Sequence, residues 1–394
     1  MSAHQIELLD GFEHVETVAD FQERLRLARP LRVKLGIDPT SADLHLGFMV
    51  VLHQLQRFAE AGHRVILIIG DFTARIGDPS GRNVTRPQLS REEIEANMQT
   101  YRDQAGKVLD LERIELRYNS EWLDRLNLTD LVKLLAKTTV AQMLERNDFS
   151  QRYQSGAPIA LHEFLYPVAQ AYDSVAIEAD VELGGRDQLF NLLLGRHFQR
   201  EFGQPPQICA TVPLLIGLDG QKKMSKSLGN YVGVTEPAAD QFGKLMRIPD
   251  DLIAPYARLA AFFSKDECEG LRRRLEQREA DPMLEKKRIA QAVVARYHGE
   301  PAALAARDFF ERTIQRKEIP TASIPELRLE DCGRVTEILV KAGFAESRRA
   351  AERLITGGAV KVDGALVSDV KARWTSQTPA VLSVGSRRFV RVIT

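Results

Sequence analysis

The chain has 394 residues, which predicts two or three domains because single hydrophobic cores rarely grow beyond roughly 250–300 residues. Apolar residues make up 44% and charged residues 27% of the chain, which is ordinary for a globular protein and excludes a disordered chain, a collagen-like fibre and a small disulfide scaffold. The 54 basic and 54 acidic residues cancel overall, but residues 331–394 hold 11 basic and 6 acidic side chains, and this basic tail favours a polyanion partner.

Three cysteines, Cys209, Cys268 and Cys332, lie far apart in the sequence. Their odd number and wide spacing predict neither a disulfide framework nor a zinc motif, and they favour a reducing cytoplasm. The segment 1–16 is acidic and lacks an apolar stretch, so we expect no signal peptide. No apolar run approaches the ~18 residues that span a bilayer, so we expect no membrane association.

The first half alternates short apolar runs with helical patterns. Strands are predicted at 31–37, 63–71, 114–118 and 207–212, and helices at 44–61, 161–176 and 187–201. A strand, a helix and a second strand within about 40 residues form a unit with parallel strands. The pattern therefore predicts an α/β fold with a doubly wound parallel sheet, in which ligands bind at the carboxyl ends of the strands.

The second half is helical at first and then changes character. Residues 235–316 are charge-rich and helical in pattern, and two prolines in 319–325 indicate a linker. Beyond the linker, helices are predicted at 335–341 and 347–356. A strand at 359–365 follows, with an Asp-Gly hairpin turn.

A first candidate site lies where the strand 31–37 meets the next helix. The sequence Gly36-Ile-Asp-Pro-Thr40 is followed by His45-Leu-Gly-Phe48. Free backbone N–H groups and the positive end of the helix dipole make such a place suited to phosphate. Gly47 has no side chain, so a flat ring could lie against the helix there.

A second candidate site is the lysine-rich loop at 219–230. Lys222, Lys223 and Lys226 stand among small polar residues and glycines. Several ammonium groups on a flexible loop suit a triphosphate whose leaving pyrophosphate gains charge. A solvated basic loop is the alternative, but the run Lys223–Ser227 reads KMSKS, which is a highly specific pattern.

These motifs resemble the class I aminoacyl-tRNA synthetases, in which His45–Phe48 corresponds to the HIGH motif and Lys223–Ser227 to KMSKS. Residues 35–40, 76–81, 165–173 and 181–188 are similar to bacterial tyrosyl-tRNA synthetases, and 331–371 to the S4 RNA-binding fold. The resemblance implies a Rossmann-type catalytic domain at 1–234 that binds tyrosine and ATP, a helical domain on the anticodon side at 235–318, a linker at 319–330 and an S4-like domain at 331–394.

One helix face is expected to read the amino acid. Tyr166, Gln170 and Asp173 are spaced i, i+4 and i+7, so they share a face inside an otherwise apolar helix. Tyr166 and Gln170 can accept from an ammonium group, and Asp78 can add the opposing charge. The resemblance implies that these three bind the α-amino group and that Asp173 accepts from the tyrosine hydroxyl. Such a pocket rejects phenylalanine because its polar groups would be left unpaired.

The remaining site residues follow from the same resemblance. Gly184 and Gly185 let the backbone approach a ribose, and Asp187 can accept hydrogen bonds from the ribose hydroxyls. Gln188 matches a residue that lies beside the carboxylate of the amino acid. Each expected role has its own residues: catalysis, Thr40, His45, Lys223 and Lys226; tyrosine binding, Asp78, Tyr166, Gln170, Asp173 and Gln188; ATP binding, Asp38, Gly47, Gly185, Asp187 and Lys226; RNA binding, Arg348, Arg349, Arg353 and Lys361.

The implied reaction has two steps and needs no protein nucleophile. The tyrosine carboxylate attacks the α-phosphorus of ATP to give tyrosyl-adenylate and pyrophosphate, and the tyrosyl group then passes to the 3′ end of tRNA(Tyr). Positioning and charge stabilisation carry the catalysis. We expect Mg²⁺ to accompany ATP, no tightly bound cofactor, no protein metal site and a homodimer. The apolar segment 131–143, expected to be one helix, is the candidate dimer contact.

Two residues depart from the synthetase pattern. Phe48 stands where the HIGH motif has its second histidine, which could slow adenylate formation or be tolerated because His45 and Gly47 remain. Lys34 stands where some tyrosyl enzymes have a tyrosine that meets the substrate hydroxyl. Lys34 either reaches that hydroxyl or is a solvated strand-end lysine, which is the commoner case.

Three alternatives compete with the tyrosyl assignment. A tryptophanyl enzyme has a similar core, but Gln170 and Asp173 favour a phenol over an indole. A small-molecule nucleotidyltransferase would lack a KMSKS loop joined to an S4-like tail. A non-catalytic RNA-binding protein descended from a synthetase is favoured only by Phe48.

Overall fold

The computed structural model describes residues 8–27, 29–39, 43–79, 90–316, 325–329, 333–376, 379–385 and 388–393. The chain forms two compact units: the first is Met1–Pro237 with Lys244–Tyr297, and the second is Ala238–Gly243 with His298–Thr394. The helical segment 235–318 is thus shared between the two units, and the four-part division into 1–234, 235–318, 319–330 and 331–394 stays a prediction. Most of the predicted linker lies outside the described residues.

The first unit is built on a six-stranded sheet with the order β1-β6-β5-β2-β3-β4. The strands are β1 (His14–Glu16), β2 (Arg32–Ile37), β3 (Arg64–Ile69), β4 (Ile114–Tyr118), β5 (Val181–Gly185) and β6 (Ile208–Val212). All pairs are parallel except that of β1 with β6. The chain moves outward from β2 to β4 and then returns to β5 on the other side of β2. This reversal confirms the doubly wound sheet and puts a ligand cleft at the carboxyl ends of β2 and β5.

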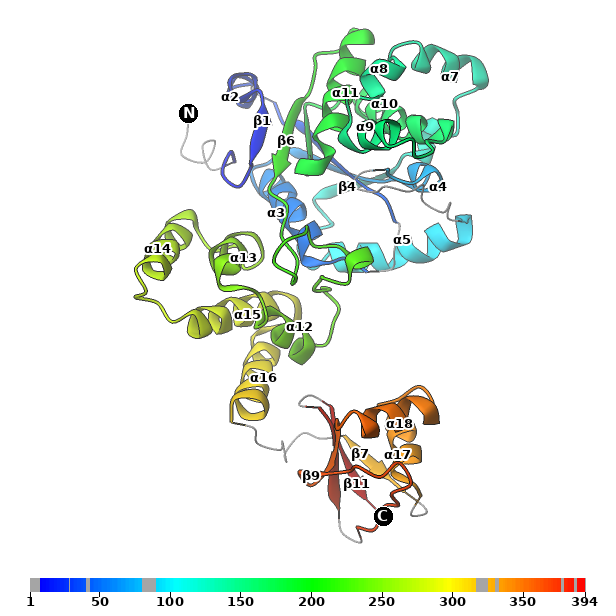
Figure 1. Ribbon diagram of the computed structural model, residues 1–394. Coiled ribbons are helices and arrows are strands. Elements are labelled where there is room, and N and C mark those ends of the chain that lie inside the picture. The colour runs from blue at the N-terminus through cyan, green and yellow to red at the C-terminus, as the bar shows by residue number, and fades with distance from the viewer. Residues whose placement is uncertain are drawn as a thin grey trace. The chain divides into compact units, whose positions relative to one another are not determined.

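Helices cover both faces of this sheet. In Figure 1, α3 and α5 lie on one side of it, and α10 and α11 lie on the other. Five of the six residues of β3 are buried between these layers, as its Val- and Ile-rich sequence predicts. The helical elements of this part are α2 (Val18–Leu25), α3 (Leu46–Glu60), α4 (Thr73–Ile76), α5 (Arg91–Ala105), α6 (Ser120–Leu123), α7 (Leu128–Leu135), α8 (Val140–Met143), α9 (Asn147–Gln154), η1 (Leu161–Phe164), α10 (Leu165–Ala176), η2 (Arg186–Gln188) and α11 (Leu189–Glu201).

Local sequence explains where the site-bearing helices begin. The predicted helix at 161–176 starts as the 3₁₀ turn η1 and continues as α10. Pro167 is tolerated because it lies in the first turn of α10, where its missing N–H would have no partner within the helix. The predicted helix at 187–201 likewise begins with a 3₁₀ turn, η2, before α11.

The single helix expected at 131–143 was a wrong prediction. The structure has two short helices there, α7 and α8, separated by residues 136–139. The Thr139 side chain accepts from the backbone N–H of Gln142 and starts α8 as a new helix. A threonine that caps in this way competes with the continuation of the preceding helix.

A run of helices follows the sheet. It comprises η3 (Lys226–Leu228), α12 (Ala238–Leu245), η4 (Asp250–Leu252), α13 (Ile253–Leu259), α14 (Lys265–Glu276), α15 (Pro282–His298), α16 (Glu300–Phe310) and the π-helical turn η5 (Glu311–Gln315). The helices expected within 267–279 and 284–298 are α14 and α15. Across the described ranges, no helix combines the length and the apolarity needed to cross a membrane.

The second unit carries a five-stranded sheet in the order β7-β11-β10-β8-β9. Its elements are β7 (Glu326–Arg328), α17 (Val335–Lys341), α18 (Arg348–Thr356), β8 (Val360–Val362), β9 (Ala365–Leu366), β10 (Ala380–Val384) and β11 (Arg388–Ile393). β8 and β9 form the expected hairpin, and Asp363 and Gly364 in its turn both have positive φ, at 47° and 85°. Ile338, Ile355 and Trp374 belong to the buried core between helices and sheet.

Candidate active site

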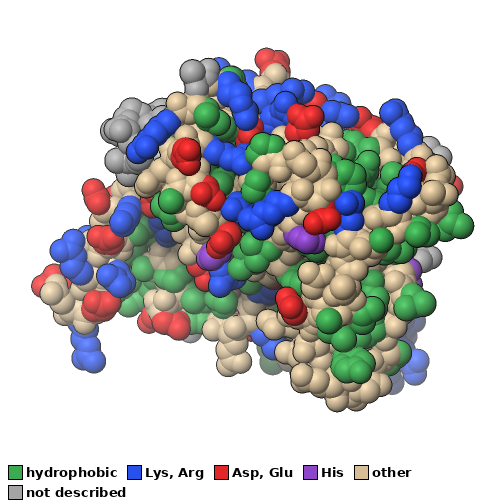
Figure 2. Space-filling model, turned by 90° about the horizontal axis from the view of Figure 1, so that it is seen from above, with side chains coloured by type: hydrophobic (Ala, Val, Ile, Leu, Met, Phe, Trp, Pro, Cys, Tyr) green, Lys and Arg blue, Asp and Glu red, His purple; other side chains and the backbone are tan. Residues whose placement is uncertain are grey.

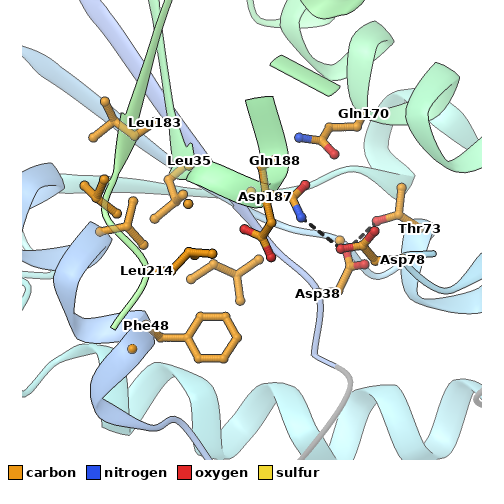
Figure 3. A pocket seen from close by; sticks show the side chains of 18 of the residues that line it. Leu35, Asp38, Phe48, Thr73, Asp78, Gln170, Leu183, Asp187, Gln188 and Leu214 are labelled. Carbon is orange, nitrogen blue, oxygen red and sulfur yellow. Dashed lines mark hydrogen bonds between the residues drawn. The ribbon is translucent and has the colours of Figure 1, made fainter. Parts of the chain in front are cut away.

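A cavity of about 430 Å³ lies at the carboxyl ends of the parallel strands. Figure 3 shows acidic and amide side chains, among them Asp38, Asp78 and Gln188, on one side of it and Leu35 and Leu183 on another. Twelve of the predicted site residues line the cavity: Asp38, His45, Gly47, Asp78, Tyr166, Gln170, Asp173, Gly185, Asp187, Gln188, Lys223 and Lys226. The thirteenth residue predicted to act there, Thr40, lies outside the described residues.

Asp173 is a buried carboxylate held by two donors on α6 and the residue before it. The indole N–H of Trp122 donates to Oδ1 at 2.8 Å, and the amide of Asn119 donates to Oδ2 at 3.4 Å. Burial raises the pKa of Asp173 to about 7, while the ammonium of Lys34 and the two donated hydrogen bonds oppose that rise. Asp173 therefore offers, in the wall of the cavity, an oriented acceptor to which a ligand hydroxyl can donate.

Sequence reasoning missed both donors to Asp173. Trp122 and Asn119 follow β4 closely, and the only signal was their position after the carboxyl end of a predicted strand. That signal does not reveal which side chain turns toward a helix that lies about 50 residues further along the chain.

The amide of Gln170 has a defined orientation. Its Nε2 donates to Glu182 Oε1 at 3.2 Å, and its Oε1 accepts from Asn191 Nδ2 at 2.9 Å. The oxygen therefore stays on the side of the cavity, where it can also accept from a ligand. Tyr166 on the same face is buried, and burial together with Asp38 and Asp78 raises the pKa of its phenol, which remains neutral.

Asp78 belongs to a polar cluster that joins three segments of the chain. Its Oδ1 accepts from Arg146 Nη2 at 3.2 Å and its Oδ2 from Gln188 Nε2 at 3.0 Å. Arg146 also donates to Asn191, which in turn donates to Gln188. Asp78 and Gln188 were predicted from the sequence, whereas Arg146 and Asn191, which are buried and hold them in place, were missed.

Asp38 is fixed from the neighbouring strand end. Thr73 Oγ1 donates to Asp38 Oδ1 at 2.7 Å, as Figure 3 also shows. The contact requires a glycine at position 70, because a Cβ there would lie 2.0 Å from Asp38 Oδ1 and 2.3 Å from Thr73 Oγ1. The carboxylate is thereby held at the mouth of the loop that leads to the predicted phosphate site.

His45 caps α3 and is a neutral imidazole. Its Nδ1 accepts from the backbone N–H of Gly47 at 3.2 Å, so the ring hydrogen is on Nε2. Burial lowers the pKa of His45 to about 4, and Lys226 and Lys223 lower it further in the same direction. Gly47 is needed here, since a Cβ at that position would lie 2.9 Å from the His45 ring.

Phe48 lies beside His45, with ring centroids 4.7 Å apart, and lines the cavity. The ring is only half-buried. An aromatic surface thus stands where the synthetase motif has its second histidine, next to the imidazole that remains.

The lysine loop lies across the cavity from β5. Lys223 Nζ donates to Asp187 Oδ2 at 2.5 Å, and Lys226 Nζ lies 3.4 Å from Asp43 Oδ2. Asn230 holds the base of the loop by accepting from the Ser225 N–H at 2.8 Å and donating to Asp219 at 2.7 Å. The loop is therefore anchored at its ends, while Lys223 and Lys226 reach the cavity.

The glycine pair at the end of β5 admits Asp187 closely. A Cβ on Gly185 would lie 2.8 Å from Asp187 Oδ1. Figure 3 shows the Asp187 carboxylate in the middle of the cavity. The position suits a carboxylate that accepts from two adjacent hydroxyls.

Lys34 is not a solvated lysine, and that alternative was wrong. Its side chain is 1% exposed, and its Nζ lies 3.1 Å from Oε1 of Glu182. The Glu182 side chain is also 1% exposed. It is absent from the side chains that line the cavity. A strand-end position suggested solvent, but α10 and α11 cover this face of the sheet.

The predicted RNA-binding residues lie in the second unit. Arg348, Arg349 and Arg353 are exposed on α18, and Lys361 is exposed on β8. Arg348 lies 3.6 Å from Glu352 on the same helix. Arg349 and Arg353 are one helical turn apart and present their charge on one face.

Residues 26–315 match the family described as tRNA synthetases class I (W and Y), and residues 333–373 match the S4 domain. A tyrosine–tRNA ligase of Thermotoga maritima is 49% identical over 370 residues, covering 94% of this chain and 92% of that protein. A tyrosine–tRNA ligase of Moorella thermoacetica is 47% identical over 398 residues, covering 100% and 96%.

Solved structures are similar in fold. The tyrosyl-tRNA synthetase of Archaeoglobus fulgidus, complexed with L-tyrosine, has a TM-score of 0.65 at 23% identity, covering 77% of this chain and 98% of that one. A C-terminally truncated mitochondrial tyrosyl-tRNA synthetase of Aspergillus nidulans has a TM-score of 0.62 at 23% identity, covering 77% and 91%.

Proposed function

Because this chain belongs to the class I tRNA synthetases of the tryptophan and tyrosine group, we propose that it is a tyrosine–tRNA ligase, which activates L-tyrosine with ATP and transfers it to tRNA(Tyr). The observation that carries the choice of amino acid is the buried Asp173 carboxylate, fixed by Trp122 and Asn119 in the wall of the cavity. A phenol hydroxyl that enters this pocket finds an oriented acceptor, and a substrate without that hydroxyl leaves the carboxylate unpaired.

The opposite end of the amino acid meets the polar cluster. Asp78, the Gln170 Oε1 and the Tyr166 oxygen would accept from the ammonium group, with Arg146 and Asn191 keeping Asp78 and Gln170 in position. Gln188 would lie against the carboxylate. A hydroxyl acceptor and an ammonium cluster in the wall of one cavity would fix the direction of a bound tyrosine.

In the first step, one oxygen of the tyrosine carboxylate attacks the α-phosphorus of ATP. The bond between that phosphorus and the bridging oxygen of pyrophosphate breaks, and its electron pair leaves with pyrophosphate. The neutral His45 would donate from Nε2, and Lys223 and Lys226 would stabilise the charge that develops on the leaving group. Thr40 and Asp38 are proposed to act beside the phosphates.

ATP binding would rearrange the lysine loop. Two ribose hydroxyls that donate to Asp187 would share its carboxylate with Lys223 and so weaken that ion pair. When the ribose takes Asp187, beside Gly185 and Gly47, the ammonium is released toward the phosphates. In the absence of ATP, the ion pair would therefore keep the Lys223 ammonium close to the proposed phosphate site.

Mg²⁺ would accompany ATP and be held mainly by phosphate oxygens. Among the described residues, no group of three or more His, Cys, Asp or Glu side chains could hold a metal ion. The carboxylates of the cavity that lie nearest the proposed phosphate and ammonium sites already accept hydrogen bonds: Asp38 from Thr73, and Asp78 from Arg146 and Gln188.

In the second step, a terminal ribose hydroxyl of tRNA attacks the carbonyl carbon of tyrosyl-adenylate, and AMP leaves. Arg348, Arg349, Arg353 and Lys361 of the S4 domain are proposed to contact phosphates of the tRNA, because such exposed cations supply sequence-independent affinity. An enzyme with this substrate works where tRNA is charged, which we propose is the cytoplasm.

We also propose a homodimer, supported by an exposed apolar stripe on α7 and α8. Leu128, Val132 and Leu135 share one face of α7 with exposed fractions of 77%, 59% and 38%, and Val140 on α8 is 63% exposed. Figure 2 shows apolar side chains gathered at the right of the view, the side on which α7 and α8 lie in Figure 1. Exposed apolar patches of this kind mark contact surfaces.

The test of the proposed function is aminoacylation of total bacterial tRNA with labelled amino acids. We expect esterification by tyrosine and none by tryptophan or phenylalanine. Charging with tryptophan in place of tyrosine would contradict the proposal within the same family, and binding of tRNA with no charging by any amino acid would favour a non-catalytic RNA-binding protein.

A further inference from the structure

A buried ion pair lies directly beneath the helix turn that carries Asp173. Lys34 on β2 and Glu182 on β5 are register partners in adjacent parallel strands, so their side chains project from the same face of the sheet. The Lys34 Nζ and the Glu182 Oε1 are 3.1 Å apart, and each side chain is 1% exposed. Removing two charged side chains from water costs free energy of folding, which is offset only if the pair has good geometry and further hydrogen bonds.

The pair contacts α10 on both sides of Asp173. Lys34 Nζ donates to the backbone carbonyl of Gln170 at 3.4 Å. Glu182 accepts from the Gln170 amide at 3.2 Å and from the Ser174 hydroxyl at 3.1 Å. The two opposite charges therefore lie against the turn from residue 170 to residue 174, within which Asp173 points to the substrate pocket.

We propose that Lys34 and Glu182 are positioning residues that set the charge of Asp173 and thereby the preference for tyrosine over phenylalanine. The inference rests on the proposed function, since it concerns the acceptor for the tyrosine hydroxyl. Neither residue lines the cavity, so neither touches the substrate. Glu182 also accepts from the Gln170 amide, and phenylalanine, which shares the ammonium group of tyrosine, separates that contact from the effect on Asp173.

The two charges act on Asp173 in opposite directions. Lys34 lowers the pKa of Asp173 and Glu182 raises it, and Lys34 has the larger effect of the two. Because that pKa is about 7, a modest change in either charge alters the ionised fraction of Asp173 at neutral pH. A hydrogen bond from a phenol to an ionised carboxylate is stronger than one to a neutral carboxyl.

Other titratable and charged groups around α10 remain the same in all variants, and most are engaged elsewhere. Asp38 and Asp78 line the same cavity and interact with Thr73 and Arg146, respectively. Charged side chains on the elements packed around α10 are paired: Arg75 of α4 with Asp124, Glu121 of α6 with Arg117, Glu163 of η1 with Arg152, and Arg196 of α11 with Asp20. His197 of α11 forms a hydrogen bond with the Lys137 carbonyl, and His162 of η1 is half-buried. The thiol of Cys209 on β6 stays neutral because burial raises its pKa.

The experiment measures the dissociation constant of L-tyrosine against pH in the full-length protein. In the wild type the constant is expected to be flat above about pH 7 and to rise at lower pH, because protonation removes the charged acceptor. Lys34→Met is expected to move this midpoint upward by about one pH unit, and Glu182→Gln to move it downward by less, because Lys34 has the larger effect on Asp173. At pH 7, an upward shift of one unit weakens tyrosine binding about fivefold, since the ionised fraction falls from about one half to about one tenth. Phenylalanine binding is expected to change little in either variant.

Two further proteins keep the test decisive. Lys34→Met could fail to fold because it leaves Glu182 unpaired, so Glu182→Gln is also compared with the double variant Lys34→Met/Glu182→Gln, in which no charge is stranded. The double variant is expected to have the higher midpoint of the two. Glu182→Gln keeps the size of the side chain, and its amide oxygen can still accept from Gln207 Nε2 and the Ser174 hydroxyl; the double variant controls for the Lys34 charge that the single change leaves without its partner.

The matched control is Arg24→Met, which removes one positive charge from the same unit, while Asp180 keeps its ion pair with Arg29. Its midpoint is expected to equal that of the wild type. Opposite shifts in the two single variants support the proposal, whereas shifts in the same direction, or equal midpoints in Glu182→Gln and the double variant, overturn it. A wild-type protein that does not bind tyrosine would instead contradict the proposed function.

Discussion

Lys223 of the lysine loop donates to Asp187 at the end of β5, with 2.5 Å between Nζ and Oδ2. The two residues belong to segments that bind different parts of ATP in the proposed reaction, the phosphates and the ribose. In the proposed reaction, ATP would weaken this ion pair and thereby couple ribose binding to the release of a cation for catalysis.

Lys223→Ala therefore separates rate from affinity. We expect adenylate formation to slow about 100-fold, as is typical when one donor to developing charge is removed. The ground-state affinity for ATP is expected to stay the same or improve, because Asp187 no longer has a competing partner. Stopped-flow measurement of adenylate formation over a range of ATP concentrations yields both quantities.

Lys222→Ala is the matched control for that variant. Lys222 neighbours Lys223 in the same loop but is exposed and absent from the cavity lining. Its rate is expected to remain near that of the wild type. A loss of ATP affinity in Lys223→Ala equal to the loss in rate would show that the lysine serves ground-state binding.

Asp173→Asn tests the hydroxyl acceptor. The amide keeps the shape of the carboxylate and loses its charge, so tyrosine binding is expected to weaken by about 1.5–3 kcal/mol, or roughly 10- to 150-fold, while the KM for ATP changes little. Because the pKa of Asp173 is about 7, wild-type affinity for tyrosine falls as pH drops below 7, and this dependence disappears in the variant. Calorimetric titration with tyrosine at several pH values between 5.5 and 8.5 measures the tyrosine affinity and its pH dependence. Retention of the pH dependence in Asp173→Asn would assign the titration to another group.

The neighbourhood of Asp173 also separates what the sequence can predict from what it cannot. The parallel sheet, β4 and the boundaries of α17 follow from apolar periodicity. The resemblance to a known family supplied most of the twelve predicted residues that line one cavity. Trp122, Asn119, Arg146 and Asn191 were missed because their roles depend on contacts between segments far apart in the chain. Lys34 was open to a wrong interpretation for the same reason, since periodicity does not reveal that two helices cover a strand end. The short β1 was also missed, because a three-residue edge strand carries almost no periodic signal.

Phe48→His is expected to be tolerated. The Phe48 ring is half-buried at the cavity wall, and His45 keeps its cap on Gly47 without help from residue 48. Restoring an imidazole adds a polar group toward the nucleotide and removes little buried surface. Pyrophosphate exchange by the purified variant, with circular dichroism as the folding control, checks this; a folded but inactive variant would show that the nucleotide pocket depends on the aromatic ring.

Val132→Glu is expected to dissociate the proposed homodimer. A buried unpaired carboxylate at the centre of an apolar contact costs several kcal/mol, enough to separate the protomers at micromolar concentration. Sedimentation equilibrium gives the mass. Leu304→Glu is the control, because Leu304 is exposed to a similar degree, 51% against 59%, on α16 of the second unit. Equal masses for wild type and Val132→Glu would exclude the α7 stripe as the contact.

The double variant Arg349→Glu/Arg353→Glu addresses the S4 domain. Both arginines are exposed on one face of α18, so the substitutions leave the buried core of that domain intact. We expect tRNA charging to fall at least tenfold, and the slope of log affinity against log salt to become shallower by about one for each phosphate that the domain no longer binds. Pyrophosphate exchange in the absence of tRNA is expected to be unchanged, and its loss would show that this face supports the active site.

The central claim is that the cavity activates tyrosine. The most direct measurement is the exchange of labelled pyrophosphate into ATP by the full-length protein in the presence of L-tyrosine, L-tryptophan or L-phenylalanine, each alone and without tRNA. We expect exchange with tyrosine only, and no exchange by the double variant Asp173→Asn/Lys223→Ala. Exchange that depends on tryptophan, or that is equal for tyrosine and phenylalanine, would contradict this claim.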